Sequence, residues 1–179
     1  GVYGNDYDRV NNNNDNLDIY YCASGSWGGI YYASSNIGIG FDLVVKSGKF
    51  GSSLYDYSSG IYVGGRYGGT HYSARAVNVQ GGYIYNLIGG PLSASNRALY
   101  NDSYIYMTGG EVDTIIGGAG QSATYGNRII QVTGGVVNHS VFGGSNGVDG
   151  SEGDGTVNGS SYIYIGGLAT IGSTSNMNN

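Results

Sequence analysis

Six stretches of this sequence share one pattern of side chains. Each begins with a run in which apolar and polar residues alternate, then passes through a glycine step into a second short apolar run. The stretches begin at Asp18, Phe41, Arg75, Ser103, Arg128 and Ser161. Alternation with a period of two predicts β-strands with one buried face. Equivalent positions recur every 23 to 34 residues, which predicts one small group of strands in each repeat.

Two architectures are built from repeats of this kind, the β-propeller and the β-solenoid. A propeller blade needs about 40 to 45 residues and four strands, which is more than these repeats contain. We therefore expect an all-β fold, a right-handed parallel β-solenoid (β-helix) of about six irregular rungs with Gly-Gly corners. The single domain is expected to span residues 1–179. Because both ends fall within the pattern, we expect a segment or processed subunit of a longer array.

In a solenoid, equivalent side chains of successive rungs stack about 4.8 Å apart and form columns. Three apolar columns are predicted to fill the interior. The first contains Tyr20, Leu43, Val77, Ile105, Ile130 and Ile163. The second contains Cys22, Val45, Val79, Met107, Val132 and Ile165. The third contains Trp27, Phe50, Ile84, Val112 and Val137.

The glycine pairs are predicted to form the corners of each rung. One set, at residues 81–82, 109–110 and 134–135, lies between the two strands of a repeat. A second set, at residues 89–90, 117–118 and 143–144, follows the second strand. A corner needs a positive φ or a close approach of two backbones, and glycine allows both. Variation in repeat length is expected in projecting loops, from about Pro91 to Asp102 and from Ser145 to Ser160.

The composition excludes several classes of protein. The chain has one Pro among 179 residues and no G-X-Y period, which excludes collagen, and its one Cys excludes a disulfide scaffold. Its apolar runs are far shorter than the roughly 20 residues of a transmembrane helix. Only seven Lys and Arg oppose twelve Asp and Glu, so we expect no nucleic-acid partner. The hydrophobic share of 40% falls in patterned runs, which argues against disorder.

The phrases "VTGGVVNHSVFGG", "MTGGEVDTIIGG" and "VQGGYIYNLIGG" carry a family resemblance. They resemble the glycine-rich β-helix repeats of bacterial extracellular surface proteins, which include adhesin-like and fibre-forming proteins. The resemblance runs from about Leu17 to Gly172. It implies an extracellular or cell-surface location and a structural or binding role, and it carries no catalytic residues across. The irregular repeat length and the 19 tyrosines depart from the more regular arrays of this kind.

Candidate catalytic and metal-binding residues are few. Glu111 and Asp113 are the one close pair of acids on a predicted strand, and Arg75 and Arg128 begin equivalent strands. No column brings two acids together on adjacent rungs, so we interpret these groups as solvated surface and expect no enzyme. The loop residues Asp149, Glu152 and Asp154, with Asn146, are calcium candidates because Ca²⁺ prefers oxygen ligands. Their spacing matches no calcium motif, so no metal or cofactor is expected.

Tyrosine is the most informative surface residue. One outward column is predicted to contain Tyr21, Val44, Asn78, Tyr106, Gln131 and Tyr164, with Tyr104 and Tyr162 beside it. Exposed tyrosines of this kind can pack against another copy, bind sugar rings or simply favour β-structure. Three N-x-[ST] sequons, at Asn101, Asn138 and Asn158, permit glycosylation.

Two functions remain open from the sequence. The first is a non-enzymatic subunit of an extracellular fibre or filament, which assembles with itself head to tail. The second is a segment of a surface adhesin that binds glycans or a host surface through its tyrosine-rich face and loops. Neither function involves insertion into a membrane.

Overall fold

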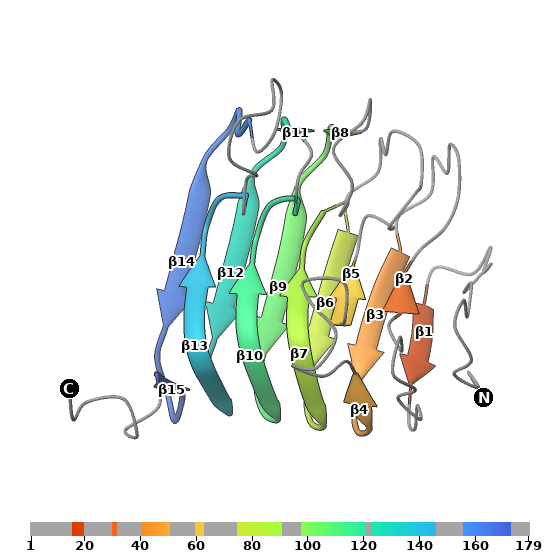
Figure 1. The fold of residues 1–179 in the computed structure, drawn as a ribbon, viewed down its shortest axis with the longest axis vertical. Helices are drawn as coiled ribbons and strands as arrows, with labels where there is room; N and C mark the ends of the chain where they lie inside the picture. Colours follow the sequence, from red (N-terminus) through yellow and green to blue (C-terminus); the bar gives the residue numbers. More distant parts are fainter. Residues whose placement is uncertain are drawn as a thin grey trace.

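The structure is a computed structural model and describes residues 16–19, 30–31, 41–50, 60–62, 75–90, 98–120, 123–145 and 156–172. Within these ranges the chain contains strands and no helix, as the alternating runs predict. Every strand pair in these ranges is parallel. The protein is therefore all-β, and most of its strands lie in two parallel sheets (Figure 1).

Successive stretches of chain contribute to the two sheets in turn. The first sheet contains, in spatial order, β1 (Asn16–Ile19), β3 (Phe41–Val45), β6 (Arg75–Val79), β9 (Ser103–Met107), β12 (Arg128–Val132) and β14 (Ser161–Ile165). The second contains β2 (Ile30–Tyr31), β5 (Gly60–Tyr62), β7 (Tyr83–Ile88), β10 (Glu111–Ile116), β13 (Val136–Phe142) and β15 (Thr170–Ile171). A further short strand, β4 (Lys49–Phe50), also pairs with β7. We call one strand of the first sheet and the second-sheet strand that follows it a unit.

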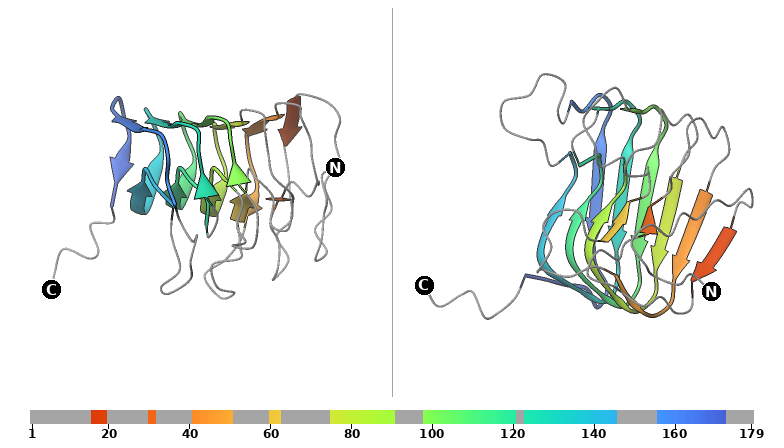
Figure 2. Two further views of the ribbon diagram at one scale, coloured as in Figure 1. Left: turned by 90° about the horizontal axis from the view of Figure 1, so that it is seen from above. Right: turned by 45° about the vertical axis from the view of Figure 1, so that its right-hand side comes forward.

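The two sheets pack against each other through one apolar core. Its buried members come from both sheets, for example Val79 and Met107 from the first and Phe50, Ile84 and Val112 from the second. Figure 2 shows the two layers of strands from above and in a view turned by 45° from that of Figure 1. This burial of one face of each sheet follows directly from the alternation in the sequence.

The strand register confirms the predicted columns from Leu43 onward. Leu43, Val77, Ile105, Ile130 and Ile163 are successive register partners, and so are Val45, Val79, Met107, Val132 and Ile165. Phe50, Ile84, Val112 and Val137 form the third column, which continues to Ile171. A fourth apolar column, absent from the sequence prediction, contains Ile61, Leu87, Ile115 and Val141.

The prediction for the first unit is wrong by three residues. Leu17 pairs with Leu43, and Ile19 pairs with Val45, in the places assigned to Tyr20 and Cys22. Asp18, and not Tyr21, pairs with Val44 in the outward column. The run "NLDI" alternates polar and apolar residues cleanly, whereas "YYC" has no polar member to mark its outer face. Tyr20, Tyr21, Cys22 and Trp27 themselves lie outside the described residues.

A positive φ explains why glycine forms the corner between the two main strands of three units. Gly82, Gly110 and Gly135 have φ of 80°, 81° and 84°, a region that other residues seldom occupy. The hydrogen-bonded ladder continues through these corners, since Glu111 N donates to Gly82 O and Val136 N donates to Gly110 O. The second glycine pairs serve close approach instead, because a Cβ on Gly89 would collide with the carbonyl oxygen of Gly117.

The regions expected to be plain loops carry a third, short line of strands. β8 (Ala98–Leu99) pairs with β11 (Ala123–Thr124), and Thr124 forms a further parallel bridge with Val157. The rings of Tyr100 and Tyr125 stack beside this line, with centroids 4.7 Å apart. Three of the described connections between units therefore contribute to a third line of pairing beside the two main sheets.

The assigned strand faces predict opposite effects at two neighbouring positions. Val132 is fully buried between its register partners Met107 and Ile165, so Val132→Asp would place an unpaired charge in the apolar core and should destabilise the fold by several kcal/mol. Gln131→Asp, one residue away on the exposed face, should leave the thermal midpoint nearly unchanged. Equal midpoints for the two variants would contradict the assignment.

Candidate functional site

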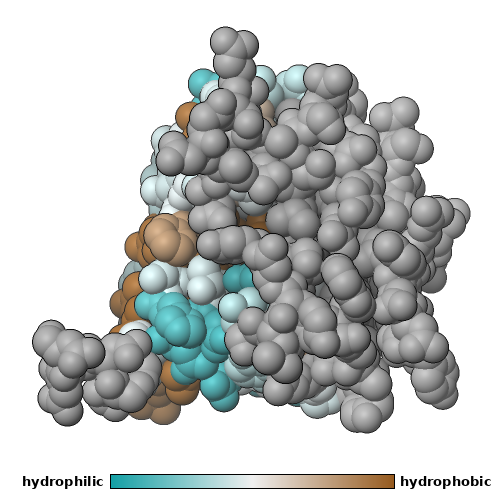
Figure 3. All heavy atoms as spheres, in the orientation of Figure 1, coloured by the Kyte–Doolittle hydropathy of each residue, from teal (hydrophilic) through white to brown (hydrophobic). Residues whose placement is uncertain are grey.

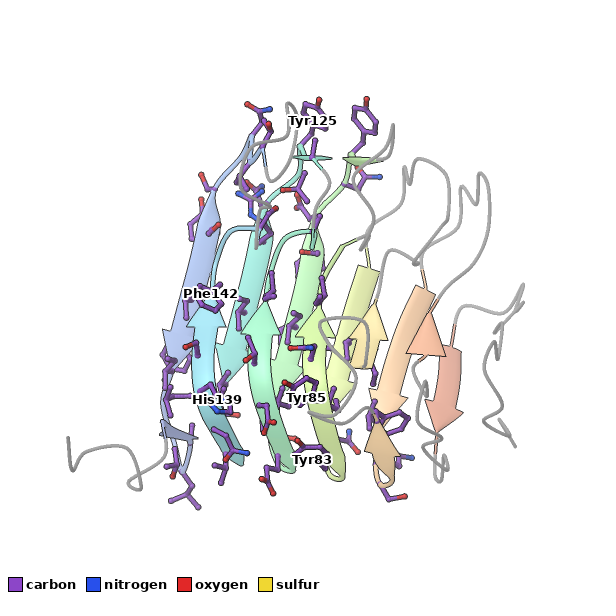
Figure 4. The ribbon with its side chains drawn as sticks, viewed as in Figure 1. Tyr83, Tyr85, Tyr125, His139 and Phe142 are labelled. Atoms are coloured by element: carbon purple, nitrogen blue, oxygen red, sulfur yellow. The ribbon has the colours of Figure 1, made fainter. Side chains whose placement is uncertain are left out.

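Polar side chains gather on the outer face of the second sheet, around β10. Asp113 stands in the middle of this strand, with Tyr83 of β7 on one side and Asn138 of β13 on the other. Figure 4 shows Tyr83 and His139 on the strands that flank β10. The register of β13 shifts here, because Val137 pairs with Val112 but Ser140 pairs with Thr114. This bulge places two residues, Asn138 and His139, opposite the single residue Asp113.

Hydrogen bonds connect this outer cluster across three strands. The Asn138 side-chain nitrogen donates to Asp113 Oδ1 at 2.6 Å and to Glu111 Oε1 at 2.7 Å. The Tyr83 hydroxyl donates to Asp113 Oδ2 at 2.7 Å. Asp113 is consequently buried, at 7% exposure, so its interpretation as solvated surface is wrong. The sequence gave no sign that Tyr83 would reach over it.

The chemistry of this cluster is that of a structural bridge. Burial, followed by the hydrogen bond to Asp113, raises the pKa of the Tyr83 hydroxyl far above its usual value near 10. Two carboxylates that cleave a glycosidic bond must face a space that holds the sugar and a water. Here the amide of Asn138 fills the space between Glu111 and Asp113 and binds both. The pair therefore holds strands together and lacks the geometry of a glycosidase site.

The second sequence interpretation that the structure contradicts concerns Arg128. It was expected on the solvated surface, but its side chain is 1% exposed. Its guanidinium donates to the carbonyl oxygens of Gly126 and Gly159, to the hydroxyl of Thr124 and, through Nε, to the hydroxyl of Ser161. Burial lowers the pKa of Arg128, opposed by the charge of Asp102. The guanidinium thus ties β12 to the next unit and to the third line of strands.

Ser103, Arg128 and Ser161 share one register position at the start of their strands. Arg75 holds the same position on β6. Ser103 donates to Gly117 O at 2.8 Å, and Ser161 donates to Gly143 O at 2.7 Å. Because serine is small, a serine at this position on each neighbouring strand leaves room for the guanidinium of Arg128. The alternation of Arg and Ser in this column is visible in the sequence and was the missed signal for burial.

The tyrosine face has the outward column that the sequence predicts. Val44, Asn78, Tyr106, Gln131 and Tyr164 are successive register partners. Tyr104 and Tyr106 are partly buried, and their rings lie 6.2 Å apart and nearly parallel. Tyr162 and Tyr164 are each 59% exposed. The structure therefore brings four of the five predicted surface tyrosines onto one side of the first sheet, and Tyr21 is outside the described residues.

The three sequons differ in what surrounds them. The hydroxyl of Ser103, needed by the sequon of Asn101, is buried and bonded to Gly117. The amide of Asn138 is held by two carboxylates. Asn158 and Ser160 are both exposed, so this sequon alone of the three presents its acceptor and its hydroxyl together in the folded chain.

The structure describes only part of the chain in which a metal site was considered. The calcium candidates Asp149, Glu152 and Asp154, as well as Asn146, lie outside the described residues. Across the described ranges, no group of three His, Cys, Asp or Glu side chains is arranged to hold a metal ion. The described part of the chain likewise has no helix long and apolar enough to cross a membrane.

Apolar side chains are exposed where the two sheets end at β14 and β15. Ile163 and Ile165 belong to the inner columns, yet they are 45% and 46% exposed, and among the described strands only β12 lies beside β14. Leu168 and Ile171, in and beside β15, and Phe142, at the end of β13, are exposed as well. Figure 3 shows apolar surface at this side of the molecule, next to a hydrophilic area. The sequence placed both isoleucines in the correct columns but could not show that their columns end uncovered.

Comparison of this chain with known proteins found no relative. No protein-family model, no curated protein and no solved structure matches this chain. The candidate sites therefore rest on the geometry of this chain alone.

Replacing the buried guanidinium tests its role as a connector. Arg128→Lys keeps the charge but cannot reach four acceptors from one planar group. We expect a loss of at least about 1.5 kcal/mol in the free energy of unfolding, the low end for one hydrogen bond to a charged group. Denaturant titration measures it. Gln131→Lys, on the exposed face of the same strand, is the control and should change stability little.

The raised pKa of Tyr83 predicts a pH dependence. The folded chain retains this proton more firmly than the unfolded chain, so the stabilisation is complete below pH about 10 and is lost as the pH rises above that value. The thermal midpoint of the natural chain should therefore fall more steeply above pH about 10 than that of Tyr83→Phe. Tyr164→Phe, at an exposed tyrosine, should follow the natural chain. Parallel curves for Tyr83→Phe and the natural chain would contradict the prediction.

Proposed function

We propose that this chain is a non-enzymatic structural protein, a subunit of an extracellular fibre in which parallel β-solenoid segments stack end to end. The observation that carries the proposal is the uncovered end at β14 and β15. There the apolar columns that are fully buried in the middle of the molecule terminate in Ile163, Ile165 and Ile171. Under this proposal each unit is one rung of the solenoid and the columns continue into the next subunit.

Two physical arguments support stacking at this end. An edge strand presents unpaired N–H and C=O groups, which favour the addition of another strand. Apolar side chains at the same edge gain from removal of water, whereas a lone edge strand in a monomeric protein normally carries charges. β14 has the sequence "SYIYI" and no charged residue. The described edge strand therefore lacks the charged side chains that usually oppose strand addition.

The same edge explains why the assembly would be a fibre. Parallel strands point in one direction, so a subunit added at β14 presents its own β14 again at the far side. Contacts between two different surfaces of one protein propagate into an open filament unless the rotation closes a ring. The outer cluster around Asp113 supports a structural role too, since both of its carboxylates are engaged in bridging strands.

A second candidate function is a segment of a surface adhesin. The exposed rings of Tyr162 and Tyr164, with the stacked pair Tyr100 and Tyr125, favour it. Aromatic faces of this kind suit sugar rings as well as other proteins. The extracellular location in both functions rests on the resemblance of the glycine-rich phrases.

Sedimentation velocity at increasing micromolar concentration distinguishes the two functions. The natural chain should form large species, and Ile165→Lys should remain monomeric because it places a charge at the end of an apolar column. Tyr164→Lys, on the opposite face of the same strand and at least as exposed, is the matched control and should still assemble. A natural chain that stays a compact monomer at every concentration would remove the fibre proposal and favour the adhesin.

A further inference from the structure

The two edges of the first sheet have matching patterns. β14 lies at one edge, and β1 lies at the other edge among the described strands. β1 reads Asn-Leu-Asp-Ile, with apolar residues at the second and fourth positions. In β14 the residues Tyr162 to Ile165 show the same alternation. The columns that end at Ile163 and Ile165 are the ones that begin at Leu17 and Ile19.

From this match we infer that a second copy of this chain adds its β1 to β14 in one defined register. The inference rests on the proposed fibre and specifies its junction. Tyr162 pairs with Asn16, Ile163 with Leu17, Tyr164 with Asp18, and Ile165 with Ile19. Both apolar columns then continue across the junction without a change of face.

The register within the chain supports this one choice. From β1 to β14, five successive pairings keep the same alignment, and their residue-by-residue register carries Leu17 to Ile163 and Ile19 to Ile165 without a slip. A junction shifted by one residue would move the apolar set of one strand to the outer face. A shift by two residues would keep the faces but would break the alignment that every other pairing in the sheet obeys.

The polar positions also suit this junction. On the second sheet, Tyr83 pairs with Glu111 and its hydroxyl bonds to Asp113, two residues further along the next strand. In the inferred junction, Tyr162 pairs with Asn16, and Asp18 follows two residues further along. In both places, an aspartate lies two residues beyond the register partner of a tyrosine, on the strand of the following unit.

A contact between two β14 strands is the main alternative and is disfavoured. Two copies related by a two-fold axis would bring these strands together antiparallel, and such a contact closes as a dimer. Every pairing in the described sheets is parallel, and the corners and columns repeat with that polarity. Between the two described edge strands of the first sheet, β14 against β1 is the pairing that preserves it.

Disulfide cross-linking with four cysteine pairs tests the register. In a Cys22→Ser background, Tyr164→Cys is combined with Asp18→Cys or with Asn16→Cys, and Tyr162→Cys is combined with the same two. The in-register pairs, 164 with 18 and 162 with 16, would have Cα atoms within the range of a disulfide, whereas the other two pairs would not. Each substitution occurs once in register and once out of register, so a folding defect in one of them cannot imitate the result.

The expected result is a ladder of covalent oligomers in non-reducing gels for the two in-register pairs and much less for the others. Equal cross-linking of all four pairs, or assembly without cross-links in the in-register pairs, would overturn the register and leave the fibre standing. Dimers formed as readily by Tyr164→Cys alone would show the two-fold contact and overturn it too. Absence of any assembly in sedimentation would overturn the fibre and the junction together.

Discussion

Backbone hydrogen bonds between equivalent residues of neighbouring units determine the position of almost everything else in this protein. Because each strand pairs in parallel and in register with the corresponding strand of the next unit, any side chain in one unit stands beside its counterpart in the next. A residue that suits one unit must therefore suit its neighbours. This requirement explains why the inner columns are apolar along their length and why glycine recurs at the same corner, with φ near 80° at Gly82 and Gly110.

The same constraint decides where polar groups can be buried. Arg128 is buried between two small residues, Ser103 and Ser161, and its guanidinium donates to the carbonyl oxygens of Gly126 and Gly159, which follow the third line of strands. Asp113 is covered on the outer face because the bulge in β13 brings Asn138 to it. In both cases a charged group bridges units that would otherwise be joined by backbone bonds and apolar contact alone.

The sequence predicts the columns well and the polar interactions poorly. Alternation and glycine spacing place Val79, Met107 and Val132 on adjacent strands, because both signals are local and repeat in each unit. They fail at Leu17, because no glycine pair follows the first strand at the spacing found in the later units. Burial of Arg128 and Asp113 also depends on partners that are 25 to 33 residues away, Ser161 and Asn138, which no local pattern encodes. Exposure of Ile163 likewise depends on the absence of a neighbouring strand beyond β14 in the described sheet.

The direction of the strand ladder also has a mechanical meaning. The hydrogen bonds between units run along the line in which the units follow one another, so a pull along that line loads successive pairings in series. Each pairing then carries the same force, and the shortest yields first. In the second sheet β2 and β15 are only two residues long, whereas β10 has six residues and β13 has seven. Under tension the described part of the molecule would open at its margins and keep its middle intact.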